Sequence, residues 1–289
     1  MYAQIFDYHR ASSVAEAQQL LAANPGAKLL AGGHSLLPML KLRLAAPSAL
    51  IDIGRIAALK GVTADGSGLR IGAMTTHADV AASPLVASHC VILADAAARI
   101  GDMAVRNRGT IGGSVAHADP AADLPTVLTA VGATMEIAAA GGQTRAVAAA
   151  DFFLGMMTTA VTEGEILTAI RVPTLAAGTG AAYEKFAHPA SRYAVVGAAA
   201  VVTVAAGVCR RAIIVVGGAT ATPVRLSAVE AALTGATLGA EVIAAAAAKT
   251  ADGLSGDLMG DLFASADYRR HVAGTYVARA VTAAAARAR

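Results

Sequence analysis

Two short stretches, Ala31-Gly-Gly-His-Ser35 and Thr110-Ile-Gly-Gly-Ser114, carry most of the information in this chain. Each follows a predicted strand or turn, contains two adjacent glycines and includes small hydroxyl residues. Adjacent glycines allow positive φ and remove both Cβ atoms, so successive backbone N–H groups can converge on an anion. Two such loops closing from opposite sides would suit a pyrophosphate, although either loop alone is also explained as a tight packing turn.

Composition limits the possible classes of protein. The 289 residues exceed the usual size of one domain, and 56% hydrophobic against 15% charged residues excludes a disordered chain. The net charge of +3 is spread along the chain, there is no Trp, and aromatic residues make up only 4%, which argues against nucleic-acid binding. The two cysteines, Cys90 and Cys209, form neither a disulfide framework nor a metal site and are expected to be buried.

The sequence predicts no membrane-spanning segment. The longest run without charge, Tyr193 to Cys209, is 17 residues long and contains several β-branched residues, so it is interpreted as a buried strand ending at the Gly207 turn. The segment from Met1 to Arg10 has no apolar core of the kind found in signal peptides. We therefore expect a cytoplasmic protein.

Several common catalytic motifs are missing from the sequence. It contains no Gly-x-Gly-x-x-Gly, no Walker loop, no Gly-x-Ser-x-Gly and no His-Glu-x-x-His. The sequence therefore argues against four classes of enzyme: Rossmann dehydrogenases, nucleotide kinases, α/β-hydrolases and zinc proteases.

Local patterns predict a two-domain α+β protein. A capping box at Ser13-x-x-Glu16 opens a helix to about Ala23. The remaining expected elements of the first domain are strands at 28–31, 49–53, 69–72, 134–138, 145–147 and 165–172, with helices from 35, at 76–89 and at 91–99. The Gly-rich passage 173–180 marks the boundary. Beyond it we expect strands at 183–186, 195–204 and 212–216, then helices at 227–233, 241–249 and from 266 to the end. The predicted domains are 1–176, with subdomains 1–55 and 56–176, and 177–289.

Longer motifs suggest a family. The runs Ala-Gly-Gly-His-Ser-Leu-Leu-Pro-Met-Leu-Lys-Leu-Arg (31–43), Arg-Asn-Arg-Gly-Thr-Ile-Gly-Gly-Ser (106–114) and His-Ala-Asp-Pro-Ala-Ala-Asp-Leu-Pro (117–125) occur in order, followed by Glu-Lys-Phe (184–186) and Ser-Arg-Tyr-Ala-Val-Val-Gly (191–197). Together they resemble the FAD-binding medium subunits of molybdenum hydroxylases, most closely the carbon monoxide dehydrogenase branch. The resemblance covers essentially the whole chain.

The resemblance implies a fold and a cofactor. The expected fold is a two-subdomain FAD-binding domain of the vanillyl-alcohol oxidase (PCMH) type, followed by a smaller α+β domain of the CO dehydrogenase flavoprotein C-terminal type. The implied ligand is non-covalent FAD, with Asp123 near its adenosine end, the Leu167 backbone and Lys185 at the pyrimidine edge of the flavin, and Tyr193 beside the ring. The implied residues of the two loops are Ala31, Gly32, Gly33, His34, Ser35, Leu36, Thr110, Ile111, Gly112, Gly113 and Ser114.

Each of these assignments has a simpler alternative. Lys185 could be a solvated lysine at a sheet edge, Asp123 could cap a helix starting at Pro125, and Tyr193 could be an interface or core ring. His34 could tether flavin covalently, but a local hydrogen bond is favoured. Many relatives carry Asn where Ser114 stands, which puts that one hydrogen bond in doubt. The loops also predict that Gly33→Val or Gly112→Val would abolish FAD retention in a chain that still folds.

The resemblance also implies partners. The sequence has no four-cysteine iron–sulfur set, no molybdenum-cofactor domain, no metal site and no catalytic acid or base. The implied complex is a dimer of heterotrimers with a large molybdenum-cofactor subunit and a small [2Fe-2S] subunit, in which electrons reach FAD and pass to a quinone at the inner face of the membrane. The alternatives are the flavin subunit of an aldehyde, nicotine or xanthine dehydrogenase, and a stand-alone covalent flavoprotein oxidase.

Overall fold

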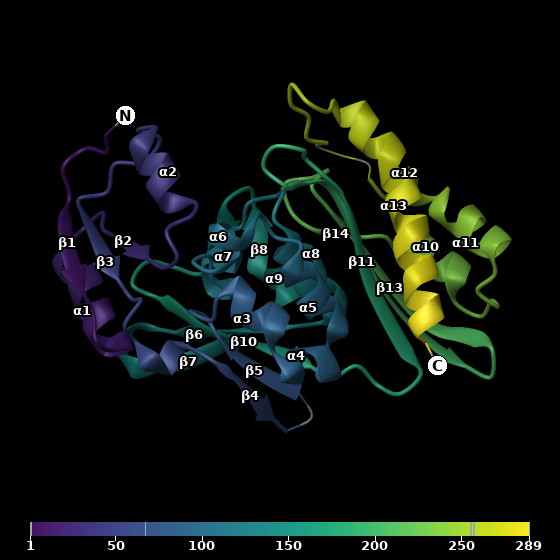
Figure 1. Cartoon of the computed structure of the whole chain (residues 1–289), viewed down its shortest axis with the longest axis horizontal. Coiled ribbons are helices and arrows are strands. Elements are labelled where there is room, and N and C mark those ends of the chain that lie inside the picture. Colours follow the sequence, from purple (N-terminus) through teal and green to yellow (C-terminus); the bar gives the residue numbers. More distant parts are fainter. Residues whose placement is uncertain (1, 67, 255, 257, 289) are drawn as a thin grey trace.

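The first subdomain is a small α/β layer at the left of Figure 1. The computed structural model describes residues 2–66, 68–254, 256 and 258–288. Three parallel strands lie in the order β1-β3-β2, where β1 is Asp7–Arg10, β2 is Lys28–Leu30 and β3 is Ala49–Asp52. The helices are α1 (Val14–Ala23) and α2 (Leu36–Lys41).

The predicted capping box at the start of α1 is confirmed, with one difference. The Ser13 hydroxyl accepts from the Glu16 N–H at 3.1 Å, which satisfies one free donor of the first turn. The Glu16 carboxylate accepts instead from the backbone N–H of Ser12 at 2.7 Å. Both ends of the box are therefore bonded, with the carboxylate reaching one residue further back than in the usual pattern.

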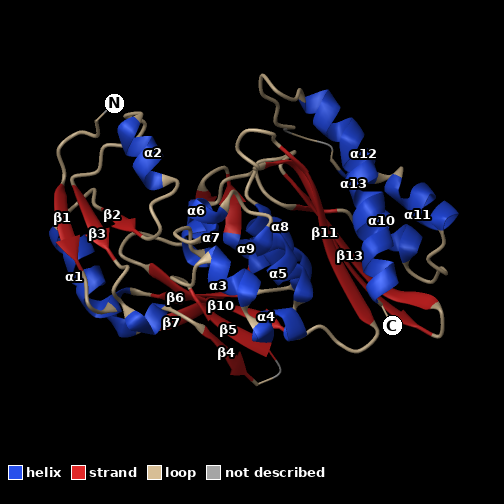
Figure 2. Ribbon diagram, viewed as in Figure 1, coloured by secondary structure: helices blue, strands red, loops and turns tan. Residues whose placement is uncertain are grey.

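The second subdomain places an antiparallel sheet beneath a layer of helices (Figure 2). The strand order is β4-β5-β10-β6-β7, so β10, the last of these strands in the sequence, lies in the centre. The strands are β4 (Val62–Asp65), β5 (Gly68–Gly72), β6 (Thr134–Ala138), β7 (Thr144–Ala148) and β10 (Ile166–Pro173). The helices are α3 (His77–Ala82), α4 (Pro84–His89), α5 (Val91–Ala98), α6 (Met103–Arg106), α7 (Ile111–His117), α8 (Asp123–Val131) and α9 (Ala149–Phe152), and the hairpin is β8 (Phe153–Gly155) with β9 (Thr158–Thr159). Two short 3₁₀ turns are η1 (Ala57–Leu59) and η2 (Ala140–Gly142).

The C-terminal domain is an antiparallel sheet in the order β11-β12-β13-β14. Its strands are β11 (Thr179–Ala187), β12 (Ala194–Ala205), β13 (Val208–Gly217) and β14 (Val224–Arg225), and its helices are α10 (Ser227–Leu233), α11 (Ala240–Ala247), α12 (Thr250–Gly253) and α13 (Ala266–Arg287). The charge-free run 193–209 is the buried strand β12 and its turn, as predicted. No helix in the described part of the chain is long and apolar enough to cross a membrane.

This last sheet is buried on both faces, which joins the two domains. Because side chains alternate along a strand, Tyr183, Ala199 and Val215 point toward the helices of the second subdomain and share its core. Their neighbours Ala182, Ala198 and Val216 pack in a separate core with α10, α11 and α13. A third, smaller core belongs to the first subdomain. The prediction of an α+β protein is therefore confirmed.

Two features of the second subdomain differ from expectation. The helix predicted over 76–89 is broken at Ser83, which ends α3 and caps α4 by accepting from the Val86 N–H at 3.3 Å. Pro84 then occupies the first turn of α4, where it has no N–H to leave unbonded. The second glycine stretch, expected to form a loop, instead begins helix α7.

The two glycine stretches contact each other through their backbones. A Cβ built on Gly32 would overlap the carbonyl oxygen of Arg108 and would lie 2.9 Å from Cα of Gly109. Gly32 therefore allows the first subdomain to approach the segment leading into α7 more closely than any other residue type would permit.

We expect Gly32→Ala to destabilise the protein by about 1–3 kcal/mol, because the added methyl group meets backbone that cannot rotate away. Urea unfolding followed by circular dichroism measures the effect. The control is Gly155→Ala, where the nearest atom to an added Cβ is Cβ of Thr158 at 3.8 Å. Equal stability of the two variants would contradict the tight contact.

Candidate functional site

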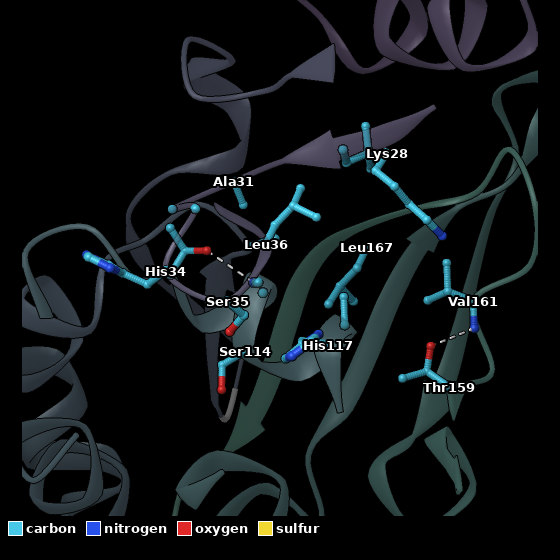
Figure 3. Close-up of a pocket in the computed structure, with 18 of the residues that line it drawn as sticks. Lys28, Ala31, His34, Ser35, Leu36, Ser114, His117, Thr159, Val161 and Leu167 are labelled. Carbon is cyan, nitrogen blue, oxygen red and sulfur yellow. Dashed lines mark hydrogen bonds between the residues drawn. The ribbon is translucent and has the colours of Figure 1, made fainter. Parts of the chain in front are cut away.

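A long cleft of about 1190 Å³ runs between the first subdomain and the rest of the molecule. Its walls come from the end of α1, strand β2, the first glycine loop, the start of α3, helix α7, and the segments 157–167 and 191–193. Figure 3 shows side chains from these elements converging on the cleft, among them Lys28, Ser35, Ser114, His117 and Leu167. The cleft is thus assembled from segments far apart in the sequence.

The structure brings most of the predicted site residues together here. The cleft is lined by Ala31, Gly32, Gly33, His34, Ser35, Leu36, Thr110, Gly112, Gly113, Ser114, Asp123, Leu167 and Tyr193. The two others lie behind its wall: Ile111 is a fully buried core residue, and Lys185 is buried against Asp123.

The first glycine loop offers a run of free backbone donors. Gly33 has φ +78°, as expected for a glycine that turns the chain. Within the described residues, the N–H groups from Gly32 to Leu36 have no hydrogen-bond acceptor, whereas the next one, Leu37 N–H, donates to the Gly33 carbonyl at 3.0 Å. Unbonded N–H groups in succession form a cradle for an anion. The prediction for this loop therefore fits the structure.

The second stretch does not form such a cradle. The N–H groups of Ile111 and Gly112 donate to the carbonyls of Thr75 and Ala73 at 2.9 and 2.8 Å, and that of Gly113 donates to the Thr110 hydroxyl at 3.1 Å. These donors are used inside the protein, so the prediction of a second anion nest is wrong. Ser114 still presents its side chain to the cleft (Figure 3).

Gly112 serves packing, not backbone conformation. Gly112 does not have a positive φ, so its backbone conformation is open to other residues. A Cβ built on it, however, would overlap the Ala73 side chain and lie 2.7 Å from the Ala73 carbonyl oxygen. The packing argues against the expectation that Gly112→Val leaves a folded chain, because the larger side chain would push α7 away from Ala73.

Asp123 and Lys185 form a buried ion pair. The Lys185 Nζ donates to Asp123 Oδ2 at 2.9 Å and to the carbonyls of Arg99 and Arg192 at 2.9 and 2.7 Å, and the Tyr183 hydroxyl donates to Asp123 Oδ1 at 2.6 Å. Three acceptors satisfy all three ammonium protons. The alternative that Lys185 is a solvated lysine at a sheet edge is wrong, because its side chain is buried. The alternative that Asp123 caps a helix is also wrong, because its carboxylate accepts no hydrogen bond from the first turn of α8.

The pair corrects the expected placement of these two residues. Asp123 was assigned to the adenosine end and Lys185 to the flavin end, but their contact puts both at the same end of the cleft. Burial raises the pKa of Asp123 and lowers the pKa of Lys185, and the attraction between the two opposes both shifts. Each charge is retained in this dry environment because the other is present.

Tyr193 lies at this same end. Its side chain is 40% exposed and lines the cleft, and burial of the rest of the ring, with Asp119 nearby, raises the pKa of its hydroxyl. Arg192 beside it has φ +60°, and Met157, which also lines the cleft, has φ +52°. Non-glycine residues held in this region are strained and tend to occur at functional sites.

The opposite end contains residues that the sequence did not single out. Lys28 points into the cleft opposite Thr159 and Val161 (Figure 3). Glu165 also lines this end, and its bidentate contact with Arg145 lowers the pKa of its carboxyl to about 2. No motif marks Lys28, because a lysine beginning a short strand is common, and only the fold shows that it faces the cleft.

Two histidines also line the cleft beyond the predicted set, namely His77 at the start of α3 and His117 at the end of α7. The predicted His34 is exposed, and its Nε2 lies 3.3 Å from the Ala104 carbonyl on α6. The expected hydrogen bond is therefore made across the cleft wall, not locally. No group of three or more metal-ligating side chains occurs among the described residues.

This geometry defines a class of protein. A cleft of about 1190 Å³, with a run of free backbone N–H donors and a lysine among its lining residues, suits an extended anionic ligand such as a dinucleotide. Family models match in the same order: an FAD binding domain in molybdopterin dehydrogenase over residues 4–175, and a CO dehydrogenase flavoprotein C-terminal domain over residues 181–284. The chain belongs to this family of FAD-binding medium subunits of molybdenum hydroxylases.

Similar proteins support the assignment along the whole chain. The carbon monoxide dehydrogenase medium chain of Hydrogenophaga pseudoflava is 43% identical, over 98% of both chains. A 6-hydroxypseudooxynicotine dehydrogenase complex subunit alpha of Paenarthrobacter nicotinovorans is 40% identical, over 98% of this chain and 96% of the relative. Among solved structures, carbon monoxide dehydrogenase from H. pseudoflava matches with a TM-score of 0.95 at 44% identity over all of both chains. Quinoline 2-oxidoreductase from Pseudomonas putida 86 matches with a TM-score of 0.92 at 34% identity, over 99% of both chains.

These findings confirm the predicted family, its two-domain FAD-binding fold and FAD as the cofactor. The chain is an oxidoreductase subunit, and in such complexes the molybdenum and iron–sulfur cofactors belong to the partner subunits. The free donors of residues 32–36 fit the negatively charged diphosphate of FAD.

The ion pair gives a stability prediction. Replacing Lys185 by Met leaves Asp123 buried and unpaired and should cost about 3–5 kcal/mol, while Lys185→Met combined with Asp123→Asn should cost much less than the two single changes added together. Urea unfolding of the four proteins measures the coupling. The control is Asp95→Asn, which breaks a pair with Arg287 whose side chains are about 40% exposed and should cost less than about 1 kcal/mol. Additive effects at Asp123 and Lys185 would contradict a tight ion pair.

Proposed function

We propose that this chain is the flavin subunit of an aerobic carbon monoxide dehydrogenase-type complex. The observation that carries the proposal is the similarity to carbon monoxide dehydrogenase medium chains over the full length of the protein, with both domains included. FAD would take electrons from the iron–sulfur clusters of a small partner subunit, after the substrate has been oxidised on a large molybdenum subunit. The proposed assembly is a dimer of such heterotrimers in the cytoplasm.

The cleft suggests how FAD is oriented. Its diphosphate would lie against the free N–H groups of residues 32–36, near the middle of the cleft. The isoalloxazine ring would extend toward Leu167 and Tyr193, where an aromatic face and a polar tip are available. The adenosine would extend the other way, between Lys28 and the 159–165 segment.

The ion pair then has an indirect role at the flavin end. With all three protons of Lys185 donated within the protein, the ammonium would act on the flavin through its charge and through the position of the Arg192 carbonyl, next to Tyr193. A positive charge near the flavin favours its anionic reduced form, but the Asp123 carboxylate at 2.9 Å offsets most of this effect, which leaves the position of the Arg192 carbonyl as the main contribution of the pair. A direct contact of Lys185 with the pyrimidine edge would require it to release one of these acceptors.

A second candidate rests on a specific relative. The 6-hydroxypseudooxynicotine dehydrogenase subunit is nearly as similar, at 40% identity over the same span, so a complex that hydroxylates an N-heterocycle is the alternative. Identification of the co-purifying large subunit, together with activity toward carbon monoxide or a pyridine substrate, distinguishes the two.

We predict one non-covalently bound FAD per chain. Acid precipitation of the purified complex should release FAD into the supernatant in equal amount to this chain, measured by absorbance and mass spectrometry. His34→Ala is the matched variant, since a covalent tether at this exposed loop histidine would be lost with the imidazole, whereas non-covalent FAD should remain bound. Flavin that stays in the acid pellet would support the covalent-oxidase alternative instead.

We also predict a quinone, not NAD, as the electron acceptor, reached at the inner face of the membrane. Hydride transfer to NAD needs its nicotinamide stacked on the flavin, and Tyr193, at the proposed flavin end of the cleft, would cover the face of the flavin on which it would stack. Steady-state assays of the complex with its substrate should show reduction of a menaquinone analogue and no formation of NADH. Tyr193→Ala tests the shielding role, because it should admit NAD if the ring is what blocks it. Rapid NADH formation by the unaltered complex would refute the prediction.

A further inference from the structure

His77 is a buried polar residue in the wall of the cleft. It is the first residue of α3, its side chain is only 4% exposed, and it lines the cleft beside the first glycine loop. The preceding Thr76 caps the helix by accepting from the Asp79 N–H at 3.1 Å, which fixes where the histidine side chain begins. Neither the motifs in the sequence nor the packing of the core accounts for an imidazole at this position.

The surroundings of the ring determine which nitrogen carries the proton. Nδ1 is enclosed and has no hydrogen-bond partner among the described residues. A proton on Nδ1 would therefore be a buried donor without an acceptor, which is costlier than leaving a lone pair unpaired. The neutral ring with its proton on Nε2 is the favoured form.

The Nε2 edge of the ring lies against Gly109, at the point where the segment before α7 meets the first glycine loop. A Cβ built on Gly109 would lie 2.8 Å from Cδ2 and 3.0 Å from Nε2 of His77, so this edge rests against Gly109. Gly109 in turn contacts Gly32, the first residue with a free N–H. His77 and the free backbone donors of residues 32–36 thus meet through Gly109 and line the same cleft.

The charges around His77 keep the ring neutral. Burial is the main cause that lowers its pKa to about 4, and electrostatic interaction with the neighbouring His34 and Arg106 contributes in the same direction. The carboxylates on adjoining elements are engaged elsewhere: Asp79 on α3 accepts from the Thr76 hydroxyl, Asp95 on α5 pairs with Arg287, and Asp102 at the start of α6 accepts from the Val105 N–H. His89 on α4 bonds the Leu85 carbonyl.

We propose that the Nε2–H of His77 donates a hydrogen bond to the diphosphate of FAD, adding a side-chain donor to the N–H cradle of residues 32–36. This inference rests on the proposed placement of the diphosphate. A neutral donor held in a dry wall bonds strongly to a charged oxygen, because the donor itself needs no further desolvation or ordering on binding.

The test measures FAD affinity of the full chain after removal of its flavin, by quenching of flavin fluorescence. His77→Phe, which removes the donor and keeps a flat ring, should raise the dissociation constant roughly 10- to 100-fold, the loss expected for one hydrogen bond to a charged group. His77→Gln, which keeps an N–H donor, should recover part of the affinity. The control His89→Phe changes a histidine on α4 outside the cleft and should bind FAD as the unaltered chain does.

A second readout addresses the contact itself. The ³¹P resonances of bound FAD should shift in His77→Gln relative to the unaltered chain and stay unchanged in His89→Phe. Nitrogen NMR of the unaltered chain should show His77 as the neutral Nε2–H form from about pH 7 down to about pH 5, in agreement with its low pKa.

The outcomes distinguish a failure of the proposed FAD placement from a failure of the inference about His77. If the unaltered chain does not bind FAD, the proposed placement fails. If it binds but His77→Phe binds within about twofold of it, or the ³¹P resonances of His77→Gln do not move, the inference about His77 is overturned and the placement stands. If His77→Phe does not fold, His77→Gln and the NMR of the unaltered chain decide, and an Nδ1–H form or an imidazolium would overturn the inference.

Discussion

The contact between the backbone of Gly32 and the segment Arg108–Gly109 is the constraint on which the site depends. It brings the first subdomain against the second without any intervening side chain. The missing Cβ of Gly32 permits this close approach. The chain then turns at Gly33, which has a positive φ, and the N–H groups that follow line the cleft without hydrogen-bond acceptors. Two adjacent glycines thus have two different tasks, one in packing and one in backbone conformation.

The second stretch shows how the same sequence pattern takes another form. Its N–H groups are drawn into bonds with Ala73, Thr75 and Thr110, because β5 and the chain that follows it lie directly against the start of α7. The result is a rigid wall facing a cradle of free donors. The run of free backbone donors therefore lies on one side of the cleft, and the α7 side offers side chains such as Ser114 instead.

The end of the cleft at Tyr193 is built by both domains. Asp123 begins α8 of the first domain and Lys185 lies on β11 of the second, and the core around Tyr183 is shared between them. A charge pair buried in this shared core fixes how the domains meet, because sliding one against the other would leave a charge unpaired. The anion cradle, in contrast, relies on neutral donors, with Lys28 the lysine at the far end. This agrees with a sequence whose positive charges are scattered.

The sequence by itself determined the elements whose causes are local. The capping box at Ser13, the hairpin through Gly207 and the buried run after Tyr193 follow from residues within a few positions of one another, and the structure contains all three. Family motifs identified the FAD-binding fold, and most of the site residues that they marked line the cleft. Tertiary structure alone decided that the N–H of Gly112 is bonded to Ala73, that Asp123 meets Lys185, and that Lys28 and His77 face the cleft. Each of these contacts joins residues that are tens of positions apart in the sequence. A local sequence pattern therefore cannot show whether a backbone donor is bonded inside the protein or free to bind a ligand.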